Sequence, residues 1–146
     1  MILIDRRQIA TMIPHAGTMC LLDAVLCWDS VSLRCLSRCH RRQDNPMRRP
    51  QGTLGAACGI EMAAQAMALH GRLTEGGCGP LRHGYLASLR DLHLRTPCLD
   101  EVSDDLIIDV ERVMGDATGA TYRFKIAGGG AELLSGRATV LLRAPA

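Results

Sequence analysis

One acidic side chain interrupts a long run of small and apolar residues in the middle of this sequence. Residues 52–71 read GTLGAACGIEMAAQAMALHG, and Glu61 is the one carboxylate among them. Ala and Met favour helix, and Gln65 follows four residues later, so both side chains share one helix face. A carboxylate is costly to bury unless it is paired or has a chemical task. The pattern fits a general acid or base, and equally a solvated glutamate at the edge of a core helix.

The other groups that could do chemistry are histidines and cysteines. Pro14-His15 precedes an apolar run, IPHAGTMCLLDAVL at residues 13–26, and His70 stands near the end of the Ala-rich segment, where the helix dipole would favour a cation. The seven cysteines include no C-x-x-C pair. On a strand, Cys35 and Cys39 would lie about 13 Å apart, too far for one metal ion. We therefore expect free thiols, no metal site and no cofactor.

Basic residues gather in one segment. Sixteen of the 17 Lys and Arg residues are Arg, although the net charge is only +2. A solvated loop would explain such a cluster. The segment has no aromatic residue for base stacking, which disfavours nucleic acid, whereas Arg clusters bind phosphate in a bidentate manner. The pattern permits an acidic protein or a phosphate-bearing substrate as partner. The cluster comprises Arg38, His40, Arg41, Arg42, Arg48 and Arg49.

The elements that must position these groups suggest one α+β domain over residues 1–146. A single long helix, residues 54–73, stands among strands joined by hairpin-type turns, and the expected sheet has five or six antiparallel strands. No stretch of 18 apolar residues and no secretory signal appears, so we expect a cytoplasmic protein without a membrane span. The other predicted elements are a helix at 6–12, strands at 20–27, 32–39, 84–96, 106–113, 120–126 and 132–143, and an irregular loop at 40–53.

Three segments together resemble the hotdog-fold 3-hydroxyacyl-acyl-carrier-protein dehydratases of the FabZ group. The Pro-His turn is followed by MCLLD at 19–23, the helix carries GIEMAAQ at 59–65, and SLRDLHLRTP at 88–97 is similar to the strand that ends in Arg-Pro. The resemblance covers residues 6–143. It is closer still to the ApeP-like subgroup of aryl polyene gene clusters, whose hallmarks PHAGxMCLLD, CGIExAAQAMAxHG and GYLASLRD recur here. It implies a long central helix wrapped by a curved antiparallel sheet.

The resemblance also assigns roles to residues. Glu61 aligns with the catalytic acid of the family, and the amides of Gly55 and Ala56 correspond to the donors that polarise the thioester carbonyl. His15 and Gln65 would lie around the substrate, His15 not being the catalytic histidine of that pattern. The position of that histidine is occupied by Met47, which cannot transfer a proton. His40, seven residues earlier, could replace it only if its loop moved.

These roles imply one subunit of a 3-hydroxyacyl-[acyl-carrier-protein] dehydratase, which forms trans-2-enoyl thioesters in aryl polyene or fatty-acid-type chain elongation. A second hotdog subunit would supply the histidine, although a homodimer is also compatible. The substrate would arrive on the phosphopantetheine arm of an acidic acyl carrier protein. Two other functions use the same residues: a hotdog thioesterase, in which the helix carboxylate activates water, and a non-catalytic subunit that stabilises a partner. The docking residues would be Arg41, Arg42, Arg48 and Arg49.

Overall fold

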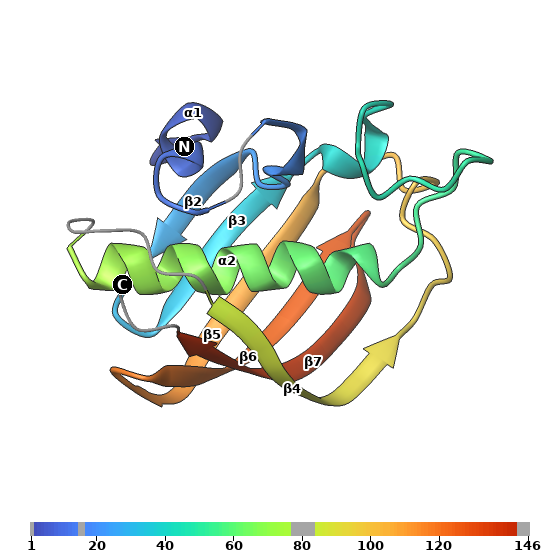
Figure 1. The fold of residues 1–146 in the computed structure, drawn as a ribbon. Coiled ribbons are helices and arrows are strands. Elements are labelled where there is room, and N and C mark those ends of the chain that lie inside the picture. The colour runs from blue at the N-terminus through green and yellow to red at the C-terminus, as the bar shows by residue number, and fades with distance from the viewer. Residues whose placement is uncertain (1, 15–16, 77–83, 143–146) are drawn as a thin grey trace.

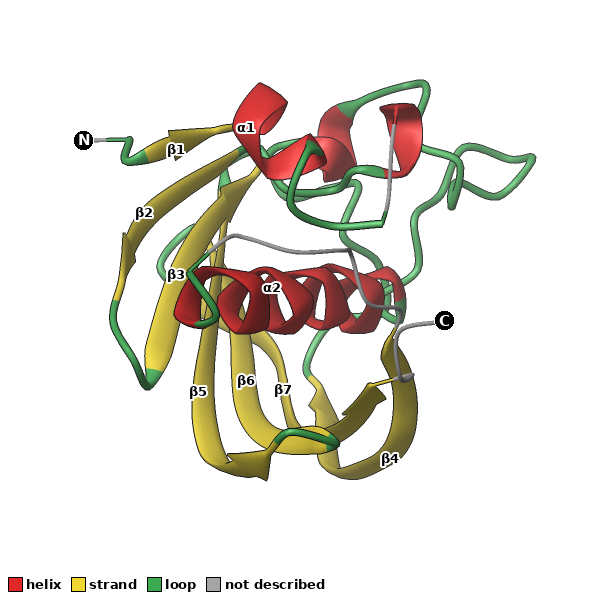
Figure 2. Cartoon of the chain, turned by 60° about the vertical axis from the view of Figure 1, so that its left-hand side comes forward, coloured by secondary structure: helices red, strands yellow, loops and turns green. Residues whose placement is uncertain are grey.

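One long helix crosses one face of a curved antiparallel sheet in the computed structural model, which describes residues 2–14, 17–76 and 84–142 (Figure 1). The helix is α2 (Cys58–Thr74). The sheet has seven strands in the order β1-β2-β3-β5-β6-β7-β4, and its strands bend around the helix (Figure 2). The strands are β1 (Ile4–Asp5), β2 (Ala24–Trp28), β3 (Ser32–Ser37), β4 (Gly84–Leu94), β5 (Leu106–Asp116), β6 (Gly119–Gly128) and β7 (Ala131–Leu142).

The core lies between α2 and the concave face of the sheet. Strand β6 shows the period of two that produces this face: Tyr122, Phe124 and Ile126 are buried, while Arg123 and Lys125 are exposed. Burial of these apolar side chains is the main stabilising contribution to such a layer. The helix contributes small and flexible side chains to the same core, namely Met62, Ala63, Ala66, Met67 and Leu69.

Gly59 sets how closely the helix approaches the sheet. A Cβ atom at this position would lie 2.7 Å from a methyl carbon of Leu134 and 3.1 Å from one of Ile126. Because real side chains do not approach so closely, any larger residue would push the first turn of α2 away from β6 and β7. The first turn also carries Glu61, so this close contact helps to fix where the carboxylate lies.

The central helix begins four residues later than predicted. Residues 54–56 pair instead with the segment after β4, through Ala56 N to Pro97 O (3.0 Å) and Leu99 N to Leu54 O (2.8 Å). This pairing uses backbone groups that a longer helix would need for its own first turn. The predicted helix over residues 54–73 is therefore wrong at its start and correct over most of its length.

The sheet also has one or two strands more than the five or six expected. The additional edge strand, β1, has only two residues, and Asp5 at its end caps the short helix α1 (Arg6–Ala10) by accepting from Gln8 N at 2.9 Å. A two-residue strand is too short to show alternation in a sequence. Two 3₁₀ turns, at Gly17–Met19 and Cys39–Arg41, complete the described elements. None of the helices in the described ranges is long and apolar enough to cross a bilayer.

Candidate active site

Glu61 lines a hollow beside the first turn of α2. The side chain is half-buried, and the hollow has a volume of about 280 Å³. The helix contributes Ala64 and Ala68, whereas β4 contributes Tyr85 and Leu86. Tyr85 and Leu86 lie on an edge strand and are 47% and 44% exposed. The carboxylate thus lines a space with largely apolar walls at the edge of the sheet.

The hollow continues along α2. A second hollow of about 300 Å³ shares Pro14, Ala68, Gly84 and Val140 with the first and extends towards the end of the helix. Ala64, Ala68 and Gly71 keep the helix surface shallow after Glu61, and Arg72 and Glu75 line the far part of the second hollow. An elongated apolar group that enters beside Glu61 could therefore lie along the helix for about 15 Å, the rise of ten helical residues.

Gln65 is fully buried and binds the chain segment that follows the Pro-His turn. Its Oε1 accepts from Leu21 N at 2.9 Å, and its Nε2 donates to Met19 O at 2.8 Å. Both polar atoms of the amide are thus engaged with backbone. The amide therefore positions the backbone of residues 19–21. His15 itself lies outside the described residues.

The start of α2 offers backbone amides next to an open hollow of about 430 Å³. The hollow is lined by Ala56, Ala57 and Arg49 on one side and by residues 94–97 on the other. Ala56 N donates to Pro97 O, whereas the amides of Gly55 and Ala57 have no hydrogen-bond partner within the described part of the chain. The helix dipole adds positive potential here. Gly55 and Ala57 are therefore the donors that a carbonyl oxygen could reach.

Met47 lies against the first residue of α2. The Cys58 thiol donates to Met47 Sδ at 3.4 Å, and Asn45 Oδ1 accepts from Met47 N at 2.9 Å, which fixes this part of the loop. Burial raises the pKa of Cys58 to about 12, so this cysteine is no thiolate nucleophile at neutral pH. The resemblance to the FabZ group places the catalytic histidine at this position, and the Met47 side chain carries no proton-transfer group.

His40 does not take the place of the family's catalytic histidine. The side chain is fully buried, with Nε2 at 3.0 Å from Val102 O and 2.9 Å from Asp104 O. Its own carbonyl accepts from Arg48 at 2.8 Å. Burial lowers the pKa of the imidazole, which therefore stays neutral inside the loop. His40 could reach the site only if these contacts were broken.

Comparison with known families decides the identity. The family model of the ApeP-like proteins, described as ApeP dehydratase, matches residues 7–144, almost the whole chain. The chain belongs to the ApeP-like dehydratase family. No curated protein matches the sequence significantly.

Solved structures agree on the fold of this ApeP-like chain. A chain of the dehydratase heterocomplex ApeI:P from Xenorhabdus doucetiae superposes with a TM-score of 0.81 at 21% identity, covering 93% of this chain and 91% of that one. Thioesterase superfamily member 2 from zebra fish gives 0.66 at 14% identity, with 94% and 95% covered. A mutant form of thioesterase PA1618 from Pseudomonas aeruginosa gives 0.57 at 14% identity, with 82% and 79% covered. At these identities the likeness shows the fold alone, and the predicted hotdog fold is confirmed.

The loop arginines of this ApeP-like dehydratase differ in their contacts. Arg41 bonds Ser103 O and Asp105, and this contact holds the pKa of the Asp105 carboxyl below its usual range. Arg42 donates to Cys20 O at 3.3 Å, and Arg48 donates to three backbone carbonyls. Arg49 is exposed and has no side-chain partner among the described residues. Three of the four predicted docking residues therefore also build the loop, and Arg49 is available to a ligand.

A buried His-Tyr pair lies near the other end of α2 and is not apparent from the sequence. His70 Nδ1 and Tyr122 Oη are 2.8 Å apart, and His70 Nε2 is 2.9 Å from Asp29 O. Burial lowers the pKa of His70 and raises that of Tyr122 to about 12, so both groups are neutral. The interpretation of His70 as a cation at the helix end is wrong. The available signal was Tyr122 at a buried strand position, because a buried tyrosine hydroxyl needs a partner.

Proposed function

We propose that this chain is the Glu-supplying subunit of a 3-hydroxyacyl-[acyl-carrier-protein] dehydratase that works with a second hotdog subunit. Membership in the ApeP-like dehydratase family supports the reaction class. Two neighbouring residues support a division of the reaction between two subunits. Glu61 lines a hollow at the first turn of α2, and Met47, which the resemblance aligns with the catalytic histidine, lies beside Cys58. One chain thus has half of the acid-base pair.

The reaction removes water from a 3-hydroxyacyl thioester and leaves a trans-2-enoyl thioester. A base takes a proton from C2, the C2–C3 double bond forms, and the hydroxyl group leaves C3 with a proton from an acid. We assign the carboxyl group of Glu61 to acid-base transfer at this carbon pair. A histidine of the second subunit would complete the pair, since among the described residues His40 and His70 are buried and held by other groups, and His93 lines a different hollow.

The thioester carbonyl would lie at the start of α2. Negative charge develops on its oxygen when the C2 proton leaves, and amide donors at a helix N-terminus stabilise that charge. The Gly55 amide is open to such a ligand, and the Ala57 amide adds a donor one residue beyond the predicted Ala56. The acyl chain would extend along the joined hollows of α2, and Gln65 would keep the 19–21 segment in place.

The substrate would be delivered by an acyl carrier protein, whose acidic surface would meet the arginines near the helix start. Arg49 is the candidate for direct contact, with Arg41, Arg42 and Arg48 shaping the loop that presents it. The assembly that supports this proposal is the ApeI:P dehydratase heterocomplex of Xenorhabdus doucetiae, which gives the highest TM-score quoted above. Aryl polyene or fatty-acid-type elongation in the cytoplasm would be the setting.

A mixing experiment tests the proposal. The purified chain, a hotdog protein with an intact catalytic histidine, and their mixture would each be given a 3-hydroxyacyl carrier protein, and the enoyl product would be measured. We expect product from the mixture at a rate far above the sum of the separate rates. Full activity of the isolated chain would contradict the division of labour. Release of free carrier thiol without enoyl product would indicate a thioesterase, and no thioester chemistry in any mixture would indicate a structural subunit.

A further inference from the structure

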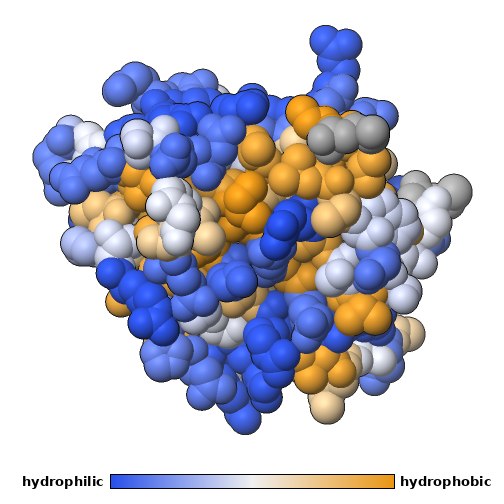
Figure 3. Space-filling view, turned by 180° about the vertical axis from the view of Figure 1, so that it is seen from behind, coloured by the Kyte–Doolittle hydropathy of each residue, from blue (hydrophilic) through white to orange (hydrophobic). Residues whose placement is uncertain are grey.

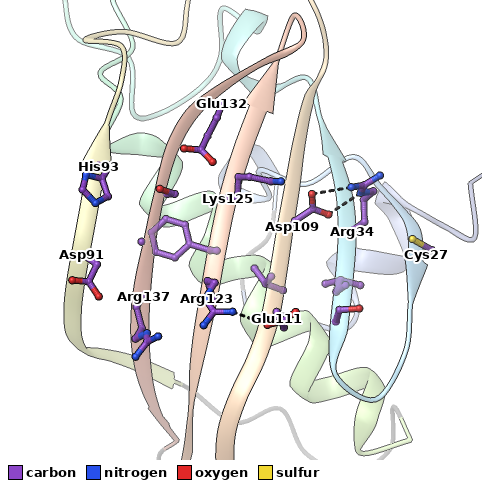
Figure 4. Close-up of a pocket in the computed structure, with 16 residues that line it drawn as sticks. Cys27, Arg34, Asp91, His93, Asp109, Glu111, Arg123, Lys125, Glu132 and Arg137 are labelled. Atoms are coloured by element: carbon purple, nitrogen blue, oxygen red, sulfur yellow. Dashed lines mark hydrogen bonds and ion pairs between the residues drawn. The ribbon is translucent and has the colours of Figure 1, made fainter.

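The outer face of the sheet, on the side away from α2, carries charged side chains in register across five strands. One cross-strand row runs from Arg34 through Asp109, Lys125 and Ser135 to His93. These side chains line a hollow of about 660 Å³ that is distinct from the hollow at Glu61 (Figure 4). Seen from behind, hydrophilic side chains cover much of this face, with apolar patches between them (Figure 3).

A second row on the same face brings three arginines together. Glu111 pairs in register with Arg123, Arg123 with Arg137, and Arg137 with Arg90, on β5, β6, β7 and β4. Figure 4 shows Arg123 and Arg137 next to each other, with Lys125 on the same strand as Arg123. Like charges directly opposite one another on neighbouring strands are destabilising. Such a row is therefore not explained by the stability of the sheet.

The acids on this face neutralise only some of these cations. Arg34 binds both oxygens of Asp109, at 2.7 and 3.1 Å, so Asp109 forms no ion pair with Lys125 opposite it. Arg123 binds Glu111 at 3.0 Å. Two further acids lie near: Glu132 is bound to Arg95 at 2.8 Å, and Asp91 stands on the β4 bulge. No hydrogen bond or ion pair to a described residue engages the side chains of Lys125, Arg137 and Arg90.

The end of β4 connects the outer face to the start of α2. Strand β4 leads from His93 through Leu94 to Arg95, and residues 94–97 form one wall of the hollow whose other wall includes Arg49 and Ala57. A macromolecule bound on the outer face near β4 is therefore next to the entrance at the helix N-terminus. A flexible arm from that macromolecule could pass around the end of β4 to the amides that precede Glu61.

We propose that the outer face of β4, β6 and β7, centred on Lys125, Arg137 and Arg90, is a docking surface for the acidic carrier protein. The inference rests on the proposed dehydratase function and extends its carrier surface beyond the arginine loop. Charge complementarity supports this inference, because an acidic helix or loop of the carrier would supply the anions that Lys125, Arg137 and Arg90 lack among the described residues.

The test uses the assembled complex of this chain with its hotdog partner. The variant Lys125→Glu/Arg137→Glu is compared with Arg7→Glu, an exposed arginine on α1 at the opposite edge of the sheet. Two substrates carry the same 3-hydroxyacyl group, one on the carrier protein and one on pantetheine alone. We expect the ratio of kcat/KM for the carrier substrate to that for the pantetheine substrate to fall at least tenfold in the double variant and less than twofold in Arg7→Glu.

Other results would overturn the proposal. An unchanged ratio in the double variant would show that the carrier docks elsewhere. Loss of the complex in size-exclusion chromatography, with the isolated chain still folded, would assign the face to the second hotdog subunit. If the double variant does not fold, Lys125→Gln and Arg137→Gln are measured in the same way and must each lower the ratio. If the wild-type complex forms no enoyl product, the dehydratase proposal fails, and binding of the unacylated carrier to wild type and variants still decides the surface.

Discussion

The sulfur atoms of Met47 and Cys58 lie 3.4 Å apart, so the loop residue at the position of the family histidine rests directly on the first turn of α2. Glu61 is three residues further along the same helix. The loop backbone around Met47 is held by Asn45 and by the three carbonyl contacts of Arg48. The loop geometry is thus fixed where the resemblance to the FabZ group places the histidine of an acid-base pair.

Placing a histidine at position 47 should produce dehydratase activity in the isolated chain. In Met47→His the imidazole would replace the thioether next to Cys58, on a loop that already has a fixed geometry. General acid-base catalysis contributes about 10²- to 10⁴-fold, so we expect the variant to form enoyl product at least roughly tenfold faster than the wild-type chain alone. Met47→Gln is the matched control, polar but unable to transfer a proton at neutral pH. Equal rates for the two variants would contradict the prediction.

Replacing the carboxyl group of Glu61 should strongly lower turnover in the complex. Glu61→Gln keeps the size of the side chain and its position in the hollow but cannot exchange a proton. We expect kcat for the 3-hydroxyacyl carrier substrate to fall by about 100-fold or more. The melting temperature, measured in parallel, should change little because the position is half-buried. A variant with wild-type kcat would make Glu61 a structural residue.

Local patterns predicted the α+β arrangement, because periodicity in this chain follows the core, whereas the hotdog fold was predicted from the resemblance of three segments to the FabZ group. The alternation of Tyr122, Phe124 and Ile126 with exposed neighbours predicted β6, and the Ala-rich run predicted most of α2. The start of α2 could not be predicted, because it depends on pairing of residues 54–56 with residues 97–99, more than 40 positions away in the sequence.

The site was predictable only where a residue type implies its own task. Glu61 stood out as a carboxylate on a small-residue helix. His40 and His70 are unavailable for proton transfer because they are buried. His40 contacts Val102 and Asp104, and His70 contacts Tyr122, and no local pattern in the sequence shows these contacts. The row of Arg123, Arg137 and Arg90 likewise exists only through strand register. Long-range pairing therefore decides which charged groups are available to ligands.

Gln65 should be important for stability more than for chemistry. In Gln65→Leu, the buried N–H of Leu21 and the C=O of Met19 would lose their partners. An unsatisfied buried polar group costs about 1 to 3 kcal/mol, so we expect the free energy of unfolding to fall by about 2 to 4 kcal/mol in urea titration. Glu61→Gln is a control on the same helix face. A loss below about 0.5 kcal/mol would mean that the 19–21 segment is held by other contacts.

Stability should fall as the pH drops from about 7.5 to about 5.5, a range that spans the ordinary histidine pKa. Burial lowers the pKa of His40 and of His70 below the ordinary value of 6.5, so the unfolded chain takes up protons in this range that the folded chain does not. A group with a lowered folded-state pKa stabilises the fold above its unfolded-state pKa, and that stability is lost as the pH falls towards the folded-state value. We therefore expect a lower melting temperature at the acidic end of this range and a shallower pH dependence in His70→Gln, measured by calorimetry at constant ionic strength. His93→Gln, an exposed position on β4, should keep the wild-type slope. If His70→Gln and His40→Gln both keep the wild-type pH dependence of the melting temperature, the buried neutral histidines do not cause the loss of stability at acidic pH.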